Sequence, residues 1–306
     1  LTAAFIALIE QLITRRTGSS SAASVTANIV TQDTKIYQTG FDATDWSGSV
    51  IARSLNTDGS IGDVSWDAAC LLTGGPCGAL GGTPVTQHQT FEQRKILTYN
   101  KSTGQTQNFK VENLTSSQIL SLTQSELIES NLATVSQLVN YLRGDQSLEE
   151  RNGGNFRSRR SILGDIIHSS ARVVRGPGES YLDDAFPEES NIKADGNTYT
   201  AFKLEHKDRQ NILLVGANDG MLHAINADNG KELWAFIPSL SLKNMHLLAN
   251  PDYGHQNYVD NTPNVRDIYI NGEWKTVAIG GLRLGGQGIY ALDITDPFNP
   301  SVLWEF

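Results

Sequence analysis

The sequence has little of what a membrane span, a nucleic-acid interface or a common catalytic motif requires. No run of about 18 apolar residues occurs, so no segment is expected to cross a membrane as a helix. The 24 Lys and Arg residues are outnumbered by 33 Asp and Glu, and the net charge of −9 argues against nucleic-acid binding, which draws most of its affinity from concentrated cationic side chains. A P-loop, a Gly-x-Ser-x-Gly elbow and a His-Glu-x-x-His motif are also missing, so three common classes of enzyme lose their best sequence evidence.

Only two cysteines are present, and they lie close together in the stretch Cys70-Leu-Leu-Thr-Gly-Gly-Pro-Cys77. The Gly-Gly-Pro segment can fold the chain back on itself, so we expect a local disulfide and with it an exported protein. A zinc site would need two further ligands nearby, and the context does not suit one. A reduced pair in a cytosolic protein is the alternative.

The composition is that of a turn-rich globular β protein. The 306 residues include 28 Gly, 9 Pro and 2 Met, and 19% are charged, which is unlike disordered or fibrous chains. This length allows one large all-β domain or two ordinary ones. Turn dipeptides separate runs of Val, Ile, Tyr, Trp and Phe at four places: Asp58-Gly59, Asp219-Gly220, Asn229-Gly230 and Asn271-Gly272. Short antiparallel strands are therefore expected.

An internal repeat is the most informative feature. A unit of three apolar segments occurs twice, at 212–216, 222–226 and 232–236 and again at 276–280, 289–293 and 302–306. Fainter copies are suggested at two further places, 49–66 and 94–109. Repeated antiparallel strands with a Gly turn and a terminal aromatic residue are typical of propeller blades, which bury their faces on their neighbours.

We therefore predict an all-β fold, a β-propeller, with Trp66, Trp234 and Trp304 as blade-packing residues. An open sandwich of two sheets is the structural rival, and the repeat favours the propeller. The three or four visible blades are fewer than a closed ring usually needs, so further blades are expected beyond Phe306.

Three segments depart from the strand pattern. Helical spacing from Ser116 to Arg143, with Thr123 and Glu126 as a capping box and Gly144 as a stop, predicts a helical insertion at about 115–143. An Asp-, Glu-, Pro- and Gly-rich stretch predicts a long acidic loop at about 176–197. Residues 1–20 predict an amphipathic helix left over from something upstream, and we take the chain to be cut from a longer polypeptide.

Some polar groups have residue types suited to chemistry. Asp165, His168, Ser169 and Ser170 include the residue types of a hydrolase triad. Residues so close in sequence rarely place three side chains in the line that a triad requires. Polar caps at strand ends explain them better. His246 and His255 bracket a loop and are a weak candidate for a metal site.

Other candidates also have ordinary structural explanations. Asp42 with Asp45, and Asp293 with Asp296, lack the Asp-x-Asp-x-Asp-Gly run of a calcium loop and are expected to cap turns. Residues 286–291 match a dinucleotide fingerprint in outline, but the sequence after the glycines alternates like a strand. The basic cluster of Arg157, Arg159 and Arg160 predicts a solvated face. No catalytic, cofactor-binding or metal residue is assigned.

Several stretches follow one another in a specific order. They are Ile36-Tyr-Gln38, Asp45-Trp-Ser-Gly48, Trp66-Asp-Ala68, Val139-Asn-Tyr-Leu-Arg-Gly-Asp145, Leu163-Gly-Asp165, Val215-Gly-Ala-Asn-Asp-Gly-Met-Leu-His-Ala-Ile-Asn226, Gly230-Lys-Glu-Leu-Trp-Ala-Phe-Ile-Pro-Ser239, Tyr258-Val-Asp260 and Gly288-Ile-Tyr-Ala-Leu-Asp-Ile-Thr295. From about residue 20 onward, the chain resembles the propeller of the PilC/PilY family of type IV pilus proteins.

This resemblance implies a modified seven-bladed propeller of the quinoprotein-like type. Residues 1–20 would resemble the last helix of a preceding von Willebrand A-like domain, and residues 21–306 the N-terminal blades. The family implies a non-enzymatic, exported protein at the pilus tip, cell surface or outer membrane of a Gram-negative bacterium. Its partners would be minor pilins, the pilus tip complex and a host-cell or surface receptor, and its roles would be priming pilus assembly, countering retraction, twitching motility and adhesion.

The chain departs from the family pattern in places. Relatives resemble one another in an Asp-rich calcium loop, which this sequence lacks, so calcium is expected only in the C-terminal blades beyond this chain. Where relatives commonly have Ser-Ser-Pro followed by a strand, this sequence has Ser170-Ala171 and then the acidic insertion. Asn261 occupies a position at which the family usually has Gly.

Two other functions share the blade pattern. A quinoprotein dehydrogenase that holds pyrroloquinoline quinone would need adjacent cysteines beneath the cofactor, whereas Cys70 and Cys77 are separated. An outer-membrane assembly scaffold would have the same propeller without a role in pili.

Overall fold

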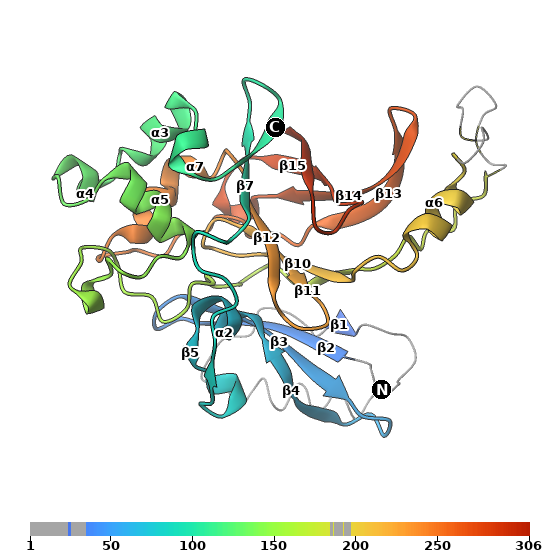
Figure 1. Ribbon diagram of the computed structural model, residues 1–306, viewed down its shortest axis with the longest axis horizontal. Coiled ribbons are helices and arrows are strands. Elements are labelled where there is room, and N and C mark those ends of the chain that lie inside the picture. The colour runs from blue at the N-terminus through green and yellow to red at the C-terminus, as the bar shows by residue number, and fades with distance from the viewer. Residues whose placement is uncertain (1–23, 26–34, 184–185, 187–191, 193–196) are drawn as a thin grey trace.

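Three sheets of four or more strands organise the chain in the computed structural model, which describes residues 24–25, 35–183, 186, 192 and 197–306 (Figure 1). The first sheet is a meander with the strand order β1-β2-β3-β4. Its strands are β1 (Ser24–Val25), β2 (Lys35–Asp42), β3 (Ser47–Leu55) and β4 (Ile61–Asp67). The predicted helix at 1–20 and part of the acidic loop at 176–197 lie outside the described residues.

The second sheet contains the first copy of the sequence repeat. Its antiparallel strands are β9 (Arg172–Val174), β10 (Ile212–Gly216), β11 (Leu222–Asn226) and β12 (Glu232–Ile237). Two more strands, β7 (Ile96–Asn100) and β8 (Gln105–Asn108), join its outer edge because β7 pairs in parallel with β12. The prediction that 94–109 is a further blade is therefore wrong, since this hairpin extends the second sheet.

The third sheet contains the second copy of the repeat. Its strands, in the order β13-β14-β15-β16, are β13 (Asn264–Ile270), β14 (Glu273–Gly281), β15 (Ile289–Asp293) and β16 (Ser301–Glu305). All four predicted turns are confirmed, because Gly59, Gly220, Gly230 and Gly272 have positive φ values between 76° and 92°.

The sheets pack face to face through apolar side chains. Tyr37 and Val50 of the first sheet share a buried cluster with Leu213 and Val215 of the second. The opposite face of the second sheet meets the third in another cluster that includes Trp234 and Tyr290. The second sheet therefore buries both of its faces on neighbouring sheets, as a propeller blade does.

Short helices lie beside the second sheet (Figure 1). The predicted insertion consists of α3 (Ser116–Leu122), α4 (Glu126–Glu129) and α5 (Val135–Arg143), and Gly144 ends it as predicted. The capping box predicted at Thr123 and Glu126 is wrong. Thr123 ends α3, and the two capping boxes are Thr115 with Gln118 and Thr134 with Gln137.

The remaining helical elements of the described residues are short. They are α2 (Ala68–Thr73), η1 (Gly78–Leu80), η2 (Val111–Asn113), η3 (Glu150–Asn152), α6 (Tyr199–His206), α7 (Leu242–Met245), η6 (His246–Ala249) and η7 (Arg283–Gly285). A two-stranded ribbon of β5 (Gly75–Pro76) and β6 (Pro84–Val85) follows α2. Strands dominate the described chain, so the all-β prediction is confirmed.

Candidate binding groove

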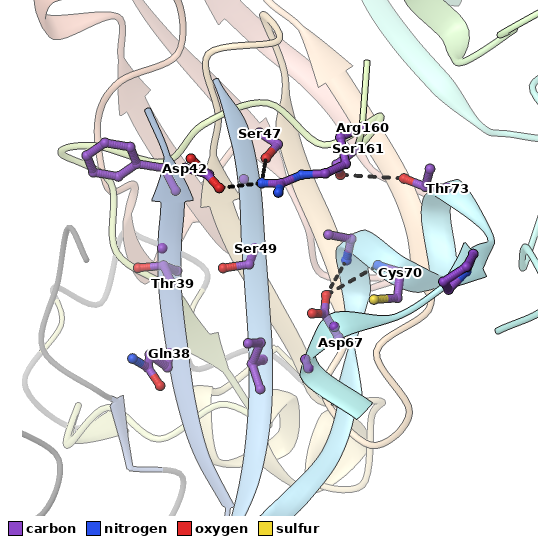
Figure 2. A pocket seen from close by; sticks show the side chains of 18 of the residues that line it. Gln38, Thr39, Asp42, Ser47, Ser49, Asp67, Cys70, Thr73, Arg160 and Ser161 are labelled. Carbon is purple, nitrogen blue, oxygen red and sulfur yellow. Dashed lines mark hydrogen bonds and ion pairs between the residues drawn. The ribbon is translucent and has the colours of Figure 1, made fainter. Parts of the chain in front are cut away.

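A cavity of about 540 Å³ lies along one face of the first sheet (Figure 2). Its floor comes from β2 and β3, its wall from α2 and the loop as far as Ala79, and its end from Arg160 and Ser161. This volume falls in the range of about 300–1,000 Å³ that is typical of small-molecule sites. It is the main concave candidate site among the described residues.

Because side chains alternate between the two faces of a strand, one set of residues in β2 and β3 faces the groove and the other faces the core. Three cross-strand pairs belong to the groove face: Gln38 with Ile51, Gly40 with Ser49, and Asp42 with Ser47. Their neighbours Tyr37, Val50 and Ala52 point to the other face and pack in the core. Because Gly40 has no side chain, the middle of the floor stays open.

The wall is held by a helix cap and a disulfide. Asp67 Oδ1 accepts hydrogen bonds from the backbone nitrogens of Ala69 at 2.8 Å and Cys70 at 3.3 Å, and so caps α2. Cys70 is bonded to Cys77, with their Cα atoms 5.6 Å apart. The two cysteines thus form the local disulfide that their spacing predicts, and Gly74 ends the helix between them with a φ of 76°.

The end of the groove carries a neutralised cation. Arg160 contacts Asp42 Oδ2 at 2.6 Å, Asp45 Oδ2 at 2.9 Å and Ser47 Oγ at 3.0 Å. Hydrogen bonds from Thr44, together with that from Arg160, lower the pKa of Asp42 to about 2. Both aspartates also cap turns, as predicted, since Thr44 N and Ser47 N donate to them.

The prediction that Arg157, Arg159 and Arg160 form one solvated face is wrong. Arg159 is buried, pairs with the buried carboxylate of Glu149 at 2.9 Å and stacks over the Tyr141 ring. Arg157 is half-buried and donates to the backbone oxygen of Leu248 at 3.0 Å. Only Arg160 is mostly exposed, with 62% of its side chain accessible.

The hydrolase-type residues do not form a triad. Asp165 accepts from Asn218 Nδ2 at 2.6 Å and contacts His255 Nε2 at 2.9 Å. His168 instead contacts Asp260 Oδ2 at 2.7 Å. Ser169 Oγ accepts from the backbone of Gly216 at 3.0 Å, so these side chains serve different partners. Ser169 caps the end of β10 at Gly216, in keeping with the expectation of polar caps at strand ends.

The weaker metal candidates likewise have structural roles. The His255 ring stacks on Trp46 at 3.8 Å, while burial lowers the pKa of His246. Asp293 pairs with Lys275 and caps Thr295, and Asp296 caps Phe298. Among the described residues, the one group of three possible metal ligands within 4.8 Å is Asp67, Cys70 and Cys77, whose two sulfurs are already bonded to each other.

The dinucleotide-like segment has no helix after its glycines. Gly286 follows the short η7 turn, and Ile289–Asp293 form strand β15. The residues therefore lack the helix N-terminus at which such a motif binds phosphate, as predicted.

A buried charge network in the second sheet has no signal in the sequence. His223, which is fully buried, contacts Glu232 Oε1 at 2.8 Å and Asp219 Oδ2 at 3.0 Å, and Glu232 also pairs with Arg94 at 2.7 Å. Burial opposes the charged form of His223, but the two carboxylates outweigh burial and raise its pKa to about 9. Arg94 and His223 likewise hold the pKa of Glu232 below its usual range against the effect of burial.

The predicted blade-packing residues differ in burial. Trp66 and Trp234 are 5% and 0% exposed, while Trp304 is half-buried and its ring centroid lies 5.2 Å from that of Phe306. Each tryptophan lies opposite an alanine on the preceding strand, and the register shifts directly after that alanine in all three sheets: Ala52 with Trp66, Ala224 with Trp234, and Ala291 with Trp304.

The recurring sheets define the fold class as a β-propeller. Residues 163–306 match the family described as the PilY1 beta-propeller domain. This part of the chain is similar to that family, and the resemblance to PilC/PilY proteins is confirmed.

Similarity to PilY1 proteins extends over nearly the whole chain. It is 36% identical over 317 aligned positions to the type IV pilus biogenesis factor PilY1 of Pseudomonas aeruginosa strain PAK, covering 98% of this chain and 25% of that protein. A PilY1 homolog of Xylella fastidiosa strain Temecula1 is 32% identical, with 99% of this chain and 21% of that protein covered. The chain thus spans about a quarter or less of these relatives' length.

A solved structure is also similar in sequence. The crystal structure of the Pseudomonas aeruginosa PilY1 C-terminal domain is 39% identical, covers 44% of this chain and 24% of that chain, and has a TM-score of 0.33. None of the described helices is long and apolar enough to span a bilayer.

Proposed function

We propose that this chain acts in type IV pilus biogenesis, as a set of propeller blades that binds other proteins and catalyses no reaction. The observation that carries the proposal is the 36% identity to a type IV pilus biogenesis factor over 98% of this chain. The described part of the chain also assigns structural roles to the residues that were candidates for hydrolysis or metal binding, which supports a non-enzymatic module.

Within this role, we infer that the protein primes pilus assembly with minor pilins at the tip, counters retraction and supports twitching motility and attachment to surfaces or host cells. It would act as an exported protein at the cell surface, an environment in which the Cys70–Cys77 disulfide persists. In this layout, residues 1–20 end a von Willebrand A-like domain and residues 21–306 supply the N-terminal blades. Calcium would bind in blades C-terminal to this chain.

A deletion of the full-length gene tests the proposal. The deleted strain is complemented with the full gene or with a version lacking residues 35–306, and surface pili and twitching are scored by electron microscopy and by subsurface spreading. We expect only the full gene to restore both. Normal pili in every strain would overturn the proposal. Defective outer-membrane proteins with normal pili would point instead to an assembly scaffold, and quinone absorbance in the purified protein to a dehydrogenase.

A further inference from the structure

We propose that the groove along the first sheet binds an uncharged saccharide. The cavity holds about 540 Å³ and is lined by strands β2 and β3, helix α2 with its disulfide loop, and the Arg160–Ser161 segment (Figure 2). This volume is large enough for a short oligosaccharide.

An amide and a hydroxyl on the floor of the groove have unused hydrogen-bonding capacity within the described part of the chain. Gln38 is only 5% exposed, yet its amide has no hydrogen-bond partner among the described residues, and its side chain lies in the groove (Figure 2). The hydroxyl of Ser49, on the neighbouring strand, is likewise without a partner in the described part of the chain. Both groups line the groove, so they suit a ligand that both donates and accepts hydrogen bonds.

The rest of the lining suits the two kinds of surface that a sugar presents. The hydroxyls of Thr73 and Ser161 stand at the far end of the groove, 3.4 Å apart. Pro76 is exposed and offers apolar surface in the lining, whereas Ile51 and Ala69 are buried. A pyranose ring combines C–H faces with hydroxyls that donate and accept, so it can use both parts of this lining.

The charge of the lining selects against anions. Among the described residues that line the groove, Arg160 is the one cationic side chain, and it is already paired with Asp42 at 2.6 Å and Asp45 at 2.9 Å. Asp67 adds a carboxylate at the wall, where it caps α2. A phosphate, sulfate or sialic acid would meet these carboxylates without a free cation, so a neutral ligand is favoured.

A disulfide, a helix cap and an ion pair hold the walls of the groove in place. The disulfide closes the loop after α2, the Asp67 cap fixes the start of that helix, and Arg160 ties the end of the groove to the β2–β3 turn. A preformed site loses less conformational entropy on binding than a mobile one.

An array of immobilised neutral oligosaccharides tests the proposal with the purified full-length protein. Sialylated and sulfated counterparts and uncharged extended peptides serve as comparison probes. We expect the neutral oligosaccharides to bind in preference to the others. The purified protein needs no pili for this measurement, so its failure would leave the assembly role untouched.

Two substitutions locate the binding in the groove. Ser49→Trp fills the floor opposite Gly40 and should abolish binding, while Gln38→Ala removes the amide from the floor and should weaken binding about 10-fold. Ser301→Trp, at an exposed strand serine of the third sheet, is the matched control and should bind like the wild type. If Ser49→Trp lowers the unfolding temperature, Gln38→Ala decides the test.

Three results would overturn the proposal. They are no binding of any neutral oligosaccharide by the wild type, preferential binding of the anionic or peptide probes, and unchanged affinity in the groove variants. Binding of a neutral oligosaccharide that disappears in Ser49→Trp and persists in Ser301→Trp would support it.

Discussion

Ala224 lies directly opposite Trp234 across strands β11 and β12, and the register shifts at the next residue. The same arrangement pairs Ala52 with Trp66 in the first sheet and Ala291 with Trp304 in the third. A small residue opposite a large one leaves space for the indole ring, and the bulge bends the strand at that point. The same Ala–Trp pair with an adjacent bulge therefore occurs in all three sheets, which accounts for part of the sequence repeat.

Trp234 should contribute more to stability than its equivalent Trp304. Its side chain is fully buried between the second and third sheets, and its Nε1 donates to the Pro297 oxygen at 2.9 Å. We expect Trp234→Ala to lower the free energy of unfolding by about 3–5 kcal/mol, as for large-to-small core substitutions. Trp304→Ala, at a half-buried site, should cost clearly less in urea denaturation, and equal losses would contradict this account of the packing.

Gly230 should tolerate alanine worse than Gly59 does. Both have a positive φ, of 76° and 85°, but a Cβ at Gly230 would lie 2.6 Å from the Trp66 ring of the first sheet, whereas at Gly59 it would meet nothing within 4 Å. Gly59→Ala therefore isolates the backbone strain, of about 1 kcal/mol. Gly230→Ala should cost more because the clash forces the two sheets apart, and matching unfolding curves for the two variants would count against it.

The stability of the fold should fall as the pH rises from 6.5 to about 9. The pKa of His223 is raised from 6.5 to about 9 by Asp219 and Glu232, which outweigh the effect of burial. A raised pKa contributes stability that is fully present below the unfolded-state pKa and is lost as the pH rises through the folded-state value. His223→Gln should remove this slope in urea denaturation across that window, and parallel curves for wild type and variant would show that another group is responsible.

The disulfide should stabilise the wall of the groove by a modest amount. Cys70 and Cys77 are separated by 7 positions, and closing so short a loop restricts the unfolded chain enough to stabilise the fold by about 2 kcal/mol. The double variant Cys70→Ser/Cys77→Ser should unfold at correspondingly lower urea concentration. Wild type treated with reductant should move to the same midpoint, and an unchanged midpoint would refute the contribution.

Local features could be predicted from the sequence because short segments determine them. The four Gly turns and the strands of both repeat copies follow from dipeptides and alternation that span a few residues. The capping box predicted at Thr123 is wrong by a few residues. Three helices in this short insertion begin at a threonine or serine, so the local signal does not identify which residue is the cap.

Non-local features could not be predicted. The parallel pairing of β7 with β12 joins residues that are far apart in sequence, and no local signal distinguishes it from a new blade. The groove combines one face of β2 and β3 with α2 and with Arg160, and the buried network joins Arg94 to Glu232. None of these residues has a distinctive local sequence pattern, so its contacts become visible only in the folded structure.

The most direct test of the pilus role is the amount of pilin sheared from the cell surface, measured by immunoblot with and without the ability to retract pili. The strains carry the full-length gene or the version lacking residues 35–306. If the protein both primes assembly and counters retraction, the shortened gene should reduce surface pilin in both backgrounds, and more strongly where retraction is active. Surface pilin equal to that of the full-length gene in both backgrounds would contradict the account.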